Sequence, residues 1–370
     1  MADQVYYNVL ISNTPTGKDY QSIPAEYSET RTIPVIDKPT DYYLSVVRFS
    51  VPMNNVPIFI FQTENGSTQT DPNLGSYSVC LTDSGGNNSQ QKLTFYPSQL
   101  YVNVPPPPSQ NPPTYTQALS PYYYVFDISH MLDMINVALV QAEAALPPVA
   151  GRDPPFFVYD ATTKLVSLKA QEAYYDTFSP GAVRIWANIP ILRFVSEIPI
   201  VSVTELAVAF EKQFYFKVYN TGNNSDGTIL TMTQETPSLS LWNDVTSVVF
   251  TTGRIPINQE AVPVEANTSD FMVKSQQGIP NCRPVLTDFE IIAQDDANLR
   301  TTLQYVPTGP YRLVDLMSDM PLRALDVQVW WQDRSNQLHK ITIGAGQHLT
   351  MKLLFVKKEY FKRLHKLTQK

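Results

Sequence analysis

Short runs in which apolar and polar side chains alternate every second residue recur along most of the chain. In residues 324–344, Leu325, Val327 and Val329 alternate with more polar positions, a polar stretch follows at residues 332–337, and alternation then resumes. A period of two residues is that of a β-strand with one buried face. About fifteen such runs predict an all-β protein organised as one or two sandwiches.

Several of these runs lie within the first 62 residues, where proline, glycine and asparagine separate them. The predicted strands there comprise residues 6–11, 31–36, 42–51 and 58–62. Both faces of the third run are largely apolar, which predicts a strand in a sheet that is covered on both sides.

The middle of the chain has a different character. Residues 63–76 and 82–91 are rich in glycine, asparagine and serine and predict loops, and residues 104–121 form a proline-rich crossing. Apolar residues at helical spacing in residues 126–148 predict one amphipathic helix that packs on a sheet. Asp127 or Ser129 is placed to cap its start, and two consecutive prolines end it.

Charged residues make up 16% of the chain, well below the roughly 25% of typical soluble domains. Together with 30 prolines and 21 tyrosines, this is typical of a β protein that buries surface against neighbours. The total charge of −7 is uneven, because residues 357–370 carry +5 and leave −12 on the rest. A basic end on an acidic body predicts contact with a polyanion or an acidic neighbour; a solvated helix end is the alternative.

Residues 357–370 are predicted to form a basic amphipathic helix, called the tail below. Its four apolar residues fall on one stripe, and two of them are Tyr360 and Leu367. The candidate interaction residues are Lys357, Lys358, Phe361, Lys362, Arg363, Leu364, Lys366 and Lys370. The apolar stripe favours a protein groove over nucleic-acid phosphates, to which binding would be strongly salt-dependent.

No GxxxxGK[ST], GxGxxG or GxSxG motif occurs in the sequence, which predicts a protein that is not an enzyme and holds no cofactor. His130 is expected on the helix surface. His339 and His348 flank the last two strands, but a metal site would need further ligands, so none is predicted. Of Trp330 and Trp331, one is expected in the core and the other at a subunit contact or a sugar.

Asp333 and Arg334 are expected to be a solvated charge pair in the hairpin loop. Cys80 and Cys282 form no disulfide framework, and no signal-peptide pattern is found at the start of the sequence. No run approaches the roughly 18 apolar residues of a membrane span. These features predict synthesis in a reducing compartment and no membrane span.

Four stretches, in this order and spanning most of the chain, carry a resemblance to a known family. They read "YYLSVVRFSVPMNNVPIFIF", "YYYVFDISHMLDMINVALVQA", "WNDVTSVVFTTGRIPI" and "LRTTLQYVPTGPYRLVDLMSDMPLRALDVQVWWQDRSNQLHKITI". The sequence resembles the penton (minor capsid) proteins of virophages and related polinton-like viruses, whose major capsid proteins are double jelly rolls. The resemblance is strongest near the carboxyl end.

This resemblance implies an all-β fold, a single jelly-roll β-sandwich with an inserted, mainly β domain that contains one helix. At the shifts in composition along the chain, residues 1–62 plus 237–370 are assigned to the jelly roll and residues 63–236 to the insertion. The implied role is structural, as a homopentamer at the five-fold vertex of an icosahedral virion, among hexamers of the major capsid protein. Assembly is expected in the host cell cytoplasm.

The resemblance also implies partners for the tail. The tail would dock beneath neighbouring capsid subunits, with internal minor proteins or packaged DNA as the other possible contacts. The alternative function is a receptor- or glycan-binding spike or fibre module of a virus, with Trp186 or Trp242 as a sugar platform.

Overall fold

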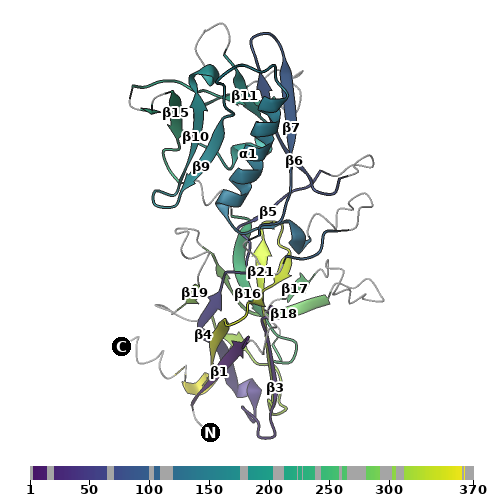
Figure 1. The fold of residues 1–370 in the computed structure, drawn as a ribbon. Coiled ribbons are helices and arrows are strands. Elements are labelled where there is room, and N and C mark those ends of the chain that lie inside the picture. The colour runs from purple at the N-terminus through teal and green to yellow at the C-terminus, as the bar shows by residue number, and fades with distance from the viewer. Residues whose placement is uncertain are drawn as a thin grey trace. The chain divides into compact units, whose positions relative to one another are not determined.

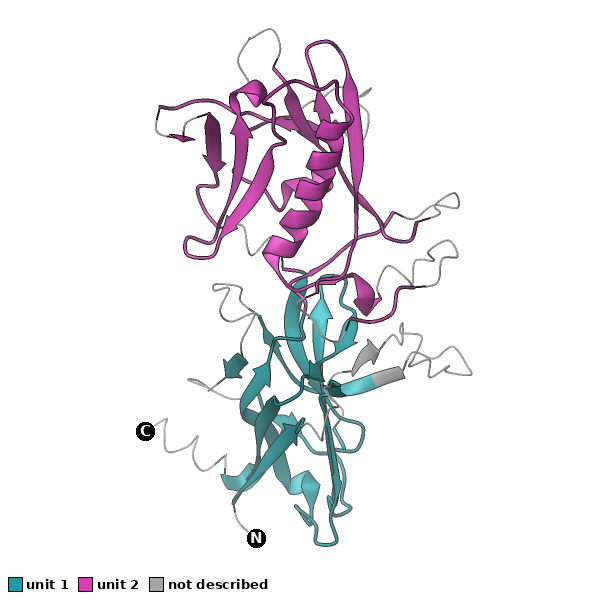
Figure 2. Cartoon of the chain, in the orientation of Figure 1, with its two compact units in different colours: residues 1–56, 244–370 teal, residues 57–243 magenta. Residues whose placement is uncertain are grey.

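The structure is a computed structural model that describes residues 3–14, 21–64, 71–99, 104–108, 120–175, 182–202, 212–222, 224–226, 228–237, 243–257, 261–264, 281–291, 302–305, 312–360 and 362. The chain forms two compact units, residues 1–56 with 244–370 and residues 57–243 (Figure 2). The sequence predicts domain borders at residues 62 and 236. That the parts on either side of these borders fold independently stays a prediction.

The first unit is a sandwich of two antiparallel sheets (Figure 1). One sheet has the order β1-β24-β4-β19, with β20 also paired to β4; the other has the order β17-β18-β16-β21-β22, with β3 also paired to β21. The strands of the first sheet are β1 (Gln4–Ser12), β24 (His348–Lys357), β4 (Tyr42–Pro52), β19 (Thr302–Tyr305) and β20 (Val314–Asp315). Those of the second are β3 (Glu26–Thr30), β21 (Ala324–Asp333), β16 (Val245–Thr251), β18 (Asn281–Glu290), β17 (Ala261–Val264) and β22 (Leu338–Lys340).

The order of the eight principal strands identifies the sandwich as a jelly roll. Counted along the chain, the first sheet places the first strand beside the eighth, then the third and the sixth. The second sheet places the second strand beside the seventh, then the fourth and the fifth. This is the arrangement of two Greek keys wrapped into one sandwich, so the predicted jelly roll is confirmed. The second unit is inserted between β4 and β16, the third and fourth of these strands.

Aromatic side chains from both sheets fill the jelly-roll core. The ring of Phe49 on β4 lies 5.0 Å from that of Phe250 on β16 and 4.6 Å from that of Phe289 on β18. The opposite, outer face of the first sheet carries a second apolar cluster of Val47, Leu354 and Val356, against which Tyr43, Leu313 and Tyr360 pack. We call this group the outer cluster. The prediction that β4 is covered on both faces is confirmed.

The second unit contains two sheets and the long helix α1 (Ile128–Ala144). Figure 1 shows α1 between β6 and β7 on one side and β9 on the other, and it contacts all three strands. One sheet comprises β12 (Ile200–Ser202), β13 (Phe214–Phe216), β11 (Arg184–Ala187), β6 (Leu74–Thr82) and β7 (Asn88–Thr94). The other comprises β14 (Ser225–Asp226), β15 (Ile229–Thr233), β10 (Leu165–Gln171) and β9 (Phe156–Asp160).

Short elements complete both units. In the first unit they are β2 (Ile23–Pro24), paired with β23 (Thr342–Ile343), and the 3-10 turn η1 (Pro39–Asp41). In the second they are β5 (Phe59–Ile60), paired with β8 (Tyr124–Val125), the short helix α2 (Ile189–Leu192), η2 (Pro121–Tyr123) and η3 (Glu172–Tyr174).

Helix α1 begins where the sequence predicts. The Asp127 carboxylate accepts the Ser129 backbone N–H at 2.8 Å, which satisfies one of the free donors at the helix start. Nine of its residues, including Leu132 and Leu139, are buried, so α1 is the predicted amphipathic helix.

Two secondary-structure predictions are wrong, one of a strand and one of loops. Residues 31–36 contain Pro34 and form irregular structure, and the second jelly-roll strand is instead the preceding segment β3, with the polar sequence EYSET. Residues 63–76 and 82–91, predicted as loops, contain both ends of β6 and the start of β7, which form a hairpin. Its tight turn forms because the Asp83 carboxylate accepts both the backbone N–H and the side-chain amide of Asn87.

Candidate interaction surfaces

The tail begins on the outer face of the jelly roll. The Lys358 Nζ lies 2.7 Å from the Asp315 carboxylate and 5.2 Å from the centre of the Tyr43 ring. The Lys357 Nζ lies 3.8 Å from the Asp3 carboxylate. These two lysines of the candidate set are therefore in ion pairs within the chain.

Beyond these lysines, the first apolar residue of the tail stripe also packs on the jelly roll, because Tyr360 contacts the outer cluster. Residues 358–360 form a helical turn, and Lys362 is exposed. The other candidates, Phe361, Arg363, Leu364, Lys366 and Lys370, lie outside the described residues. The described part of the tail is thus an anchor of the tail rather than its candidate binding surface.

Two neighbouring loops at this end of the jelly roll carry exposed apolar side chains. The backbone of residues 33–41 is hydrogen-bonded to that of residues 315–322, and the Thr40 hydroxyl donates to Asp319 at 2.8 Å. On these loops Ile33 is 75% exposed, Met317 61% and Met320 76%. We call these three residues the end-loop patch.

The rim of the end-loop patch is acidic. Its loops carry four aspartates, of which Asp41 is paired with Lys38 and Asp315 with the tail. Sequence reasoning missed the patch, because apolar and polar residues do not alternate regularly in these two segments. The sequence feature that could have indicated the patch is the run "DLMSDM" at residues 315–320, in which two methionines stand among acidic and polar residues.

The tryptophan hairpin belongs to the wall of the sandwich. Trp330 and Trp331 are both buried, at 4% and 1% exposure, so the prediction that one of them serves a contact or a sugar is wrong. Trp330 donates its indole N–H to the Thr251 hydroxyl at 2.8 Å. Trp331 stacks on the His339 ring at a centroid distance of 3.9 Å.

Asp333 was predicted to be solvated, but it is the buried last residue of β21. Its carboxylate accepts the backbone N–H groups of Ser335 and Gln337 and lies 2.9 Å from the His339 Nε2. Burial by itself would raise the pKa of Asp333, but the hydrogen bonds from His339 and Gln337 outweigh it and hold that pKa below its usual value. The group closes the hairpin turn, which is a structural role.

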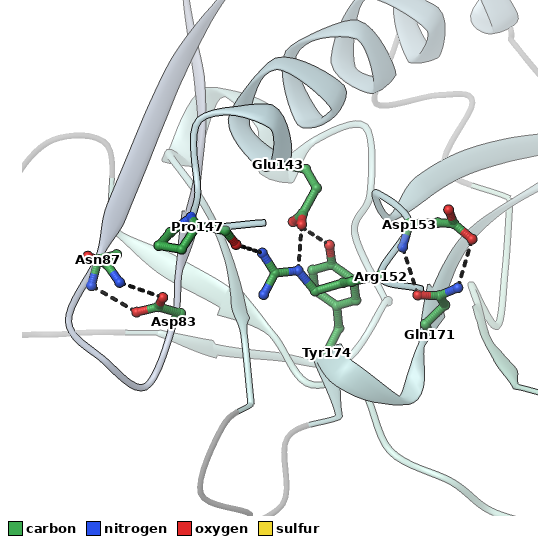
Figure 3. Close-up of polar contacts among 8 residues, drawn as sticks. All are labelled: Asp83, Asn87, Glu143, Pro147, Arg152, Asp153, Gln171 and Tyr174. Carbon is green, nitrogen blue, oxygen red and sulfur yellow. Dashed lines mark hydrogen bonds and ion pairs between the residues drawn. The ribbon is translucent and has the colours of Figure 1, made fainter. Parts of the chain in front are cut away.

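A buried ion pair joins the end of α1 to the following loop in the second unit (Figure 3). The Arg152 guanidinium donates to the Glu143 carboxylate and to the Pro147 carbonyl oxygen, and the Tyr174 hydroxyl donates to the same carboxylate at 2.6 Å. Burial raises the pKa of Tyr174, and its hydrogen bond to Glu143 raises it further. The charges of Arg152 and Glu143 are paired and the Tyr174 hydroxyl is hydrogen-bonded, so the set has a structural role.

The prediction for His130 is wrong, because this side chain is buried at 6% exposure. Its Nε2 lies 2.7 Å from the Tyr96 carbonyl oxygen, and its Nδ1 is buried without a partner. Burial lowers the pKa of His130 and raises that of the neighbouring Asp133. A depression of about 490 Å³ beside them is lined by Tyr96, Asp133, Asn136, Val137, Val140 and Gln141.

The described residues offer little for chemistry. No group of three or more metal-ligating side chains occurs among them, and His348 pairs in register with Ser12 while His339 contacts Asp333. None of the described helices is long and apolar enough to cross a membrane. Trp186 donates to the Thr82 hydroxyl and packs on a tyrosine ring, and Trp242 lies outside the described residues.

Comparisons with known proteins give a family match over nearly the whole chain. The family model of the Sputnik minor capsid protein V18/19 matches residues 5–357. Structural protein V19 of Sputnik virophage is 31% identical over 217 residues, which are 56% of this chain and 96% of that protein. Uncharacterized protein V18 of the same virophage is 39% identical over 155 residues, which are 42% of this chain and 91% of that protein.

Two solved structures share the fold. A chain of the 3.5 Å cryo-EM structure of the Sputnik virophage matches with a TM-score of 0.81 and 33% identity, over 97% of this chain and 99% of that one. The crystal structure of the mavirus penton protein matches with a TM-score of 0.65 and 14% identity, over 96% of this chain and 100% of that one. At 14% identity the second match concerns the fold alone.

Proposed function

Because the chain belongs to the family of the Sputnik minor capsid protein V18/19, we propose that it forms the five-fold vertex of an icosahedral virion as a homopentamer. It is a structural minor capsid protein, and its place is in the capsid. The observation that carries the proposal is the match of nearly the entire chain to a chain of the Sputnik particle. The jelly-roll architecture that it shares with a penton protein supports the vertex position.

The pentamer is held together by surface buried between subunits, and its five-fold symmetry closes the ring. A head-to-tail contact that repeats with a rotation of one fifth of a turn closes into a ring, whereas a contact that does not close gives filaments. An obligate contact of this kind buries upward of about 2,000 Å². Double-jelly-roll major capsid proteins surround the ring, and assembly takes place in the host cell cytoplasm.

The mass of the purified protein in solution tests the oligomeric state. Native mass spectrometry over a concentration series gives a species of five chains if the proposal holds. A trimer that persists at every concentration contradicts it and favours the spike or fibre module.

The protein has no enzymatic activity in this proposal and holds no metal or cofactor. The family is structural, and the ion pairs of the described residues serve the fold. Metal analysis of the purified protein is expected to find none bound in stoichiometric amount. One tightly held transition metal per chain would contradict this and direct attention to His339.

The tail contacts a protein surface in the capsid rather than the packaged genome. The anchoring of Tyr360 in the outer cluster supports this, since the first residue of the apolar stripe already contacts protein. The test is a chain that ends at Tyr360, which keeps the ion pairs of Lys357 and Lys358. Reduced incorporation into capsids is expected, with little change in DNA affinity across a salt series. Normal incorporation with lost, salt-sensitive DNA binding contradicts the protein-surface role.

A further inference from the structure

The end-loop patch and the start of the tail lie on the same side of one segment. Val314 and Leu316 are buried, so Asp315 and Met317 alternate with them on the outer side. The Asp315 carboxylate holds Lys358 there at 2.7 Å. Met317, two residues further, is therefore about 6.5 Å along the strand from the anchor of the tail.

The chain beyond the anchor is long enough to cover the patch. Ten residues follow Tyr360 in the sequence, and ten residues span about 15 Å even at the rise per residue of a helix. Tyr360, Leu364 and Leu367 share one stripe, and the first of them already packs on the jelly roll. A segment anchored at this place has the apolar surface of its own chain within reach.

The charges of the two partners are complementary. The loops of the patch carry Asp37, Asp41, Asp315 and Asp319 against Lys38, and the exposed Arg31 and Arg323 flank them. Asp41 pairs with Lys38 and Asp315 with Lys358, so Asp37 and Asp319 are the carboxylates proposed to face the segment. Residues 361–370 carry four basic side chains and no acidic one. Ion pairs at such exposed positions contribute little individually, but several around an apolar contact orient it.

We propose that residues 361–370 dock on the end-loop patch of their own chain, with the apolar stripe on Met317 and Met320 and the basic side chains toward the aspartates. The proposal rests on the protein-binding role of the tail and names its surface. Attachment through Lys358 and Tyr360 gives the segment a high effective concentration at its own patch, which favours this patch over that of another copy.

Methionine oxidation measures the docking directly. Met317 and Met320 are the exposed methionines of the described residues, whereas Met53 and Met351 are buried at 1% and 2% exposure. Dilute peroxide converts exposed methionine to the sulfoxide, which peptide mass spectrometry quantifies at each position. In the full chain Met317 and Met320 are expected to oxidise about threefold or more slowly than in the chain that ends at Tyr360.

A full-length variant separates docking from truncation. Leu364→Ala with Leu367→Ala removes the stripe and is expected to oxidise at the rate of the truncated chain. Leu10→Ala, at an exposed leucine on β1, is the matched control and is expected to leave the rates unchanged. Met53 and Met351 stay unoxidised in every variant if the fold is intact. Equal rates at Met317 and Met320 in full and truncated chains overturn the proposal.

Disulfide trapping identifies whose tail is bound. In a chain with Cys282→Ser, the pair Met320→Cys and Leu364→Cys is expected to form a link within one chain, which runs as a monomer without reductant. The pair Leu10→Cys and Leu364→Cys is the control and is expected to form none, because Leu10 lies far along β1 from the anchored end. A link between chains overturns the proposal in favour of another copy.

The two proposals fail in different experiments. Unchanged methionine oxidation with reduced capsid incorporation contradicts docking on the own patch and leaves the protein-binding role of the tail standing. Normal incorporation with lost DNA binding contradicts that role itself.

Discussion

At the scale of single residues, the carboxylate of Asp326 organises the loop that follows β16. Asp326 is 8% exposed, and it accepts the Thr252 hydroxyl at 2.5 Å and the backbone N–H groups of Gly253 and Arg254 at 2.8 Å each. The three donors follow β16 and Asp326 lies on β21, so this side chain holds the loop after β16 against β21.

Asp326→Ala is expected to lower the free energy of unfolding by about 3 kcal/mol, because it leaves the Gly253 N–H without an acceptor and the Arg254 N–H with only a 3.3 Å contact to the Thr252 hydroxyl. Chemical denaturation measures the change. Glu290→Ala, at an exposed carboxylate of β18, is the control and is expected to change little. A loss at Asp326 no larger than that of the control would contradict the role of the carboxylate.

His130 makes the stability of the second unit depend on pH. Burial lowers its pKa, and the groups that act on it are the Tyr96 carbonyl, Asp133 and Asp127. The folded chain therefore binds fewer protons than the unfolded chain, in which the histidine pKa is about 6.5. The stability contribution is complete above that pH and is lost progressively as the pH falls below it.

The thermal unfolding midpoint is expected to fall between neutral pH and about pH 5, and less steeply in His130→Gln, which keeps a donor for Tyr96 and does not titrate. Equal slopes for the two proteins would show that another group carries the pH dependence.

At the scale of elements, the pair of Arg152 and Glu143 holds the loop after α1. The two side chains are 6% and 12% exposed, and Tyr174 of η3 shares the carboxylate (Figure 3). Removing one partner of such a pair leaves a buried charge without compensation, which costs about 3 kcal/mol or more. Arg152→Ala is expected to lose that much stability in chemical denaturation.

A double-mutant cycle tests the coupling of this pair. Arg152→Ala combined with Glu143→Ala is expected to cost clearly less than the sum of the single changes, because each single change strands the other charge. Additive losses would contradict the coupling.

The elements also show what sequence patterns can predict. The helix α1 and the strands β1, β4 and β21 were predictable, because the spacing of their apolar side chains matches the period of a helix or of a strand. β3 was not, since its sequence EYSET contains one apolar residue and its position depends on pairing with β21, more than 290 residues away. Asp333 and His130 were misjudged for a related reason, because tertiary partners allow a polar side chain to be buried.

For the tail, the sequence shows the binding segment but not the surface to which it is proposed to bind. Its charge and its apolar stripe are visible in the sequence, but the acidic rim and the exposed methionines of the end-loop patch come together only through hydrogen bonds between two distant loops. No local pattern joins residues 33–41 to residues 315–322.

At the scale of the whole molecule, the insertion enters and leaves between two strands of a complete jelly roll. All eight principal strands lie outside residues 57–243, so the sandwich needs none of the inserted residues for its sheets. A chain in which a short linker replaces residues 57–243 is expected to unfold cooperatively as a β protein. Circular dichroism during chemical denaturation measures this, and a chain without a cooperative transition would contradict the independent folding of the jelly roll.

The central claim is that five copies of this chain form the vertex of a virion. Its most direct test is an icosahedral reconstruction of particles that contain the protein, at a resolution that traces strands. We predict density for five copies of the jelly roll around each five-fold axis, with the β1-β24-β4-β19 and β3-β21-β16-β18 sheets resolved in every copy. Density for this chain only at other positions, with a different protein on the five-fold axes, would contradict the claim.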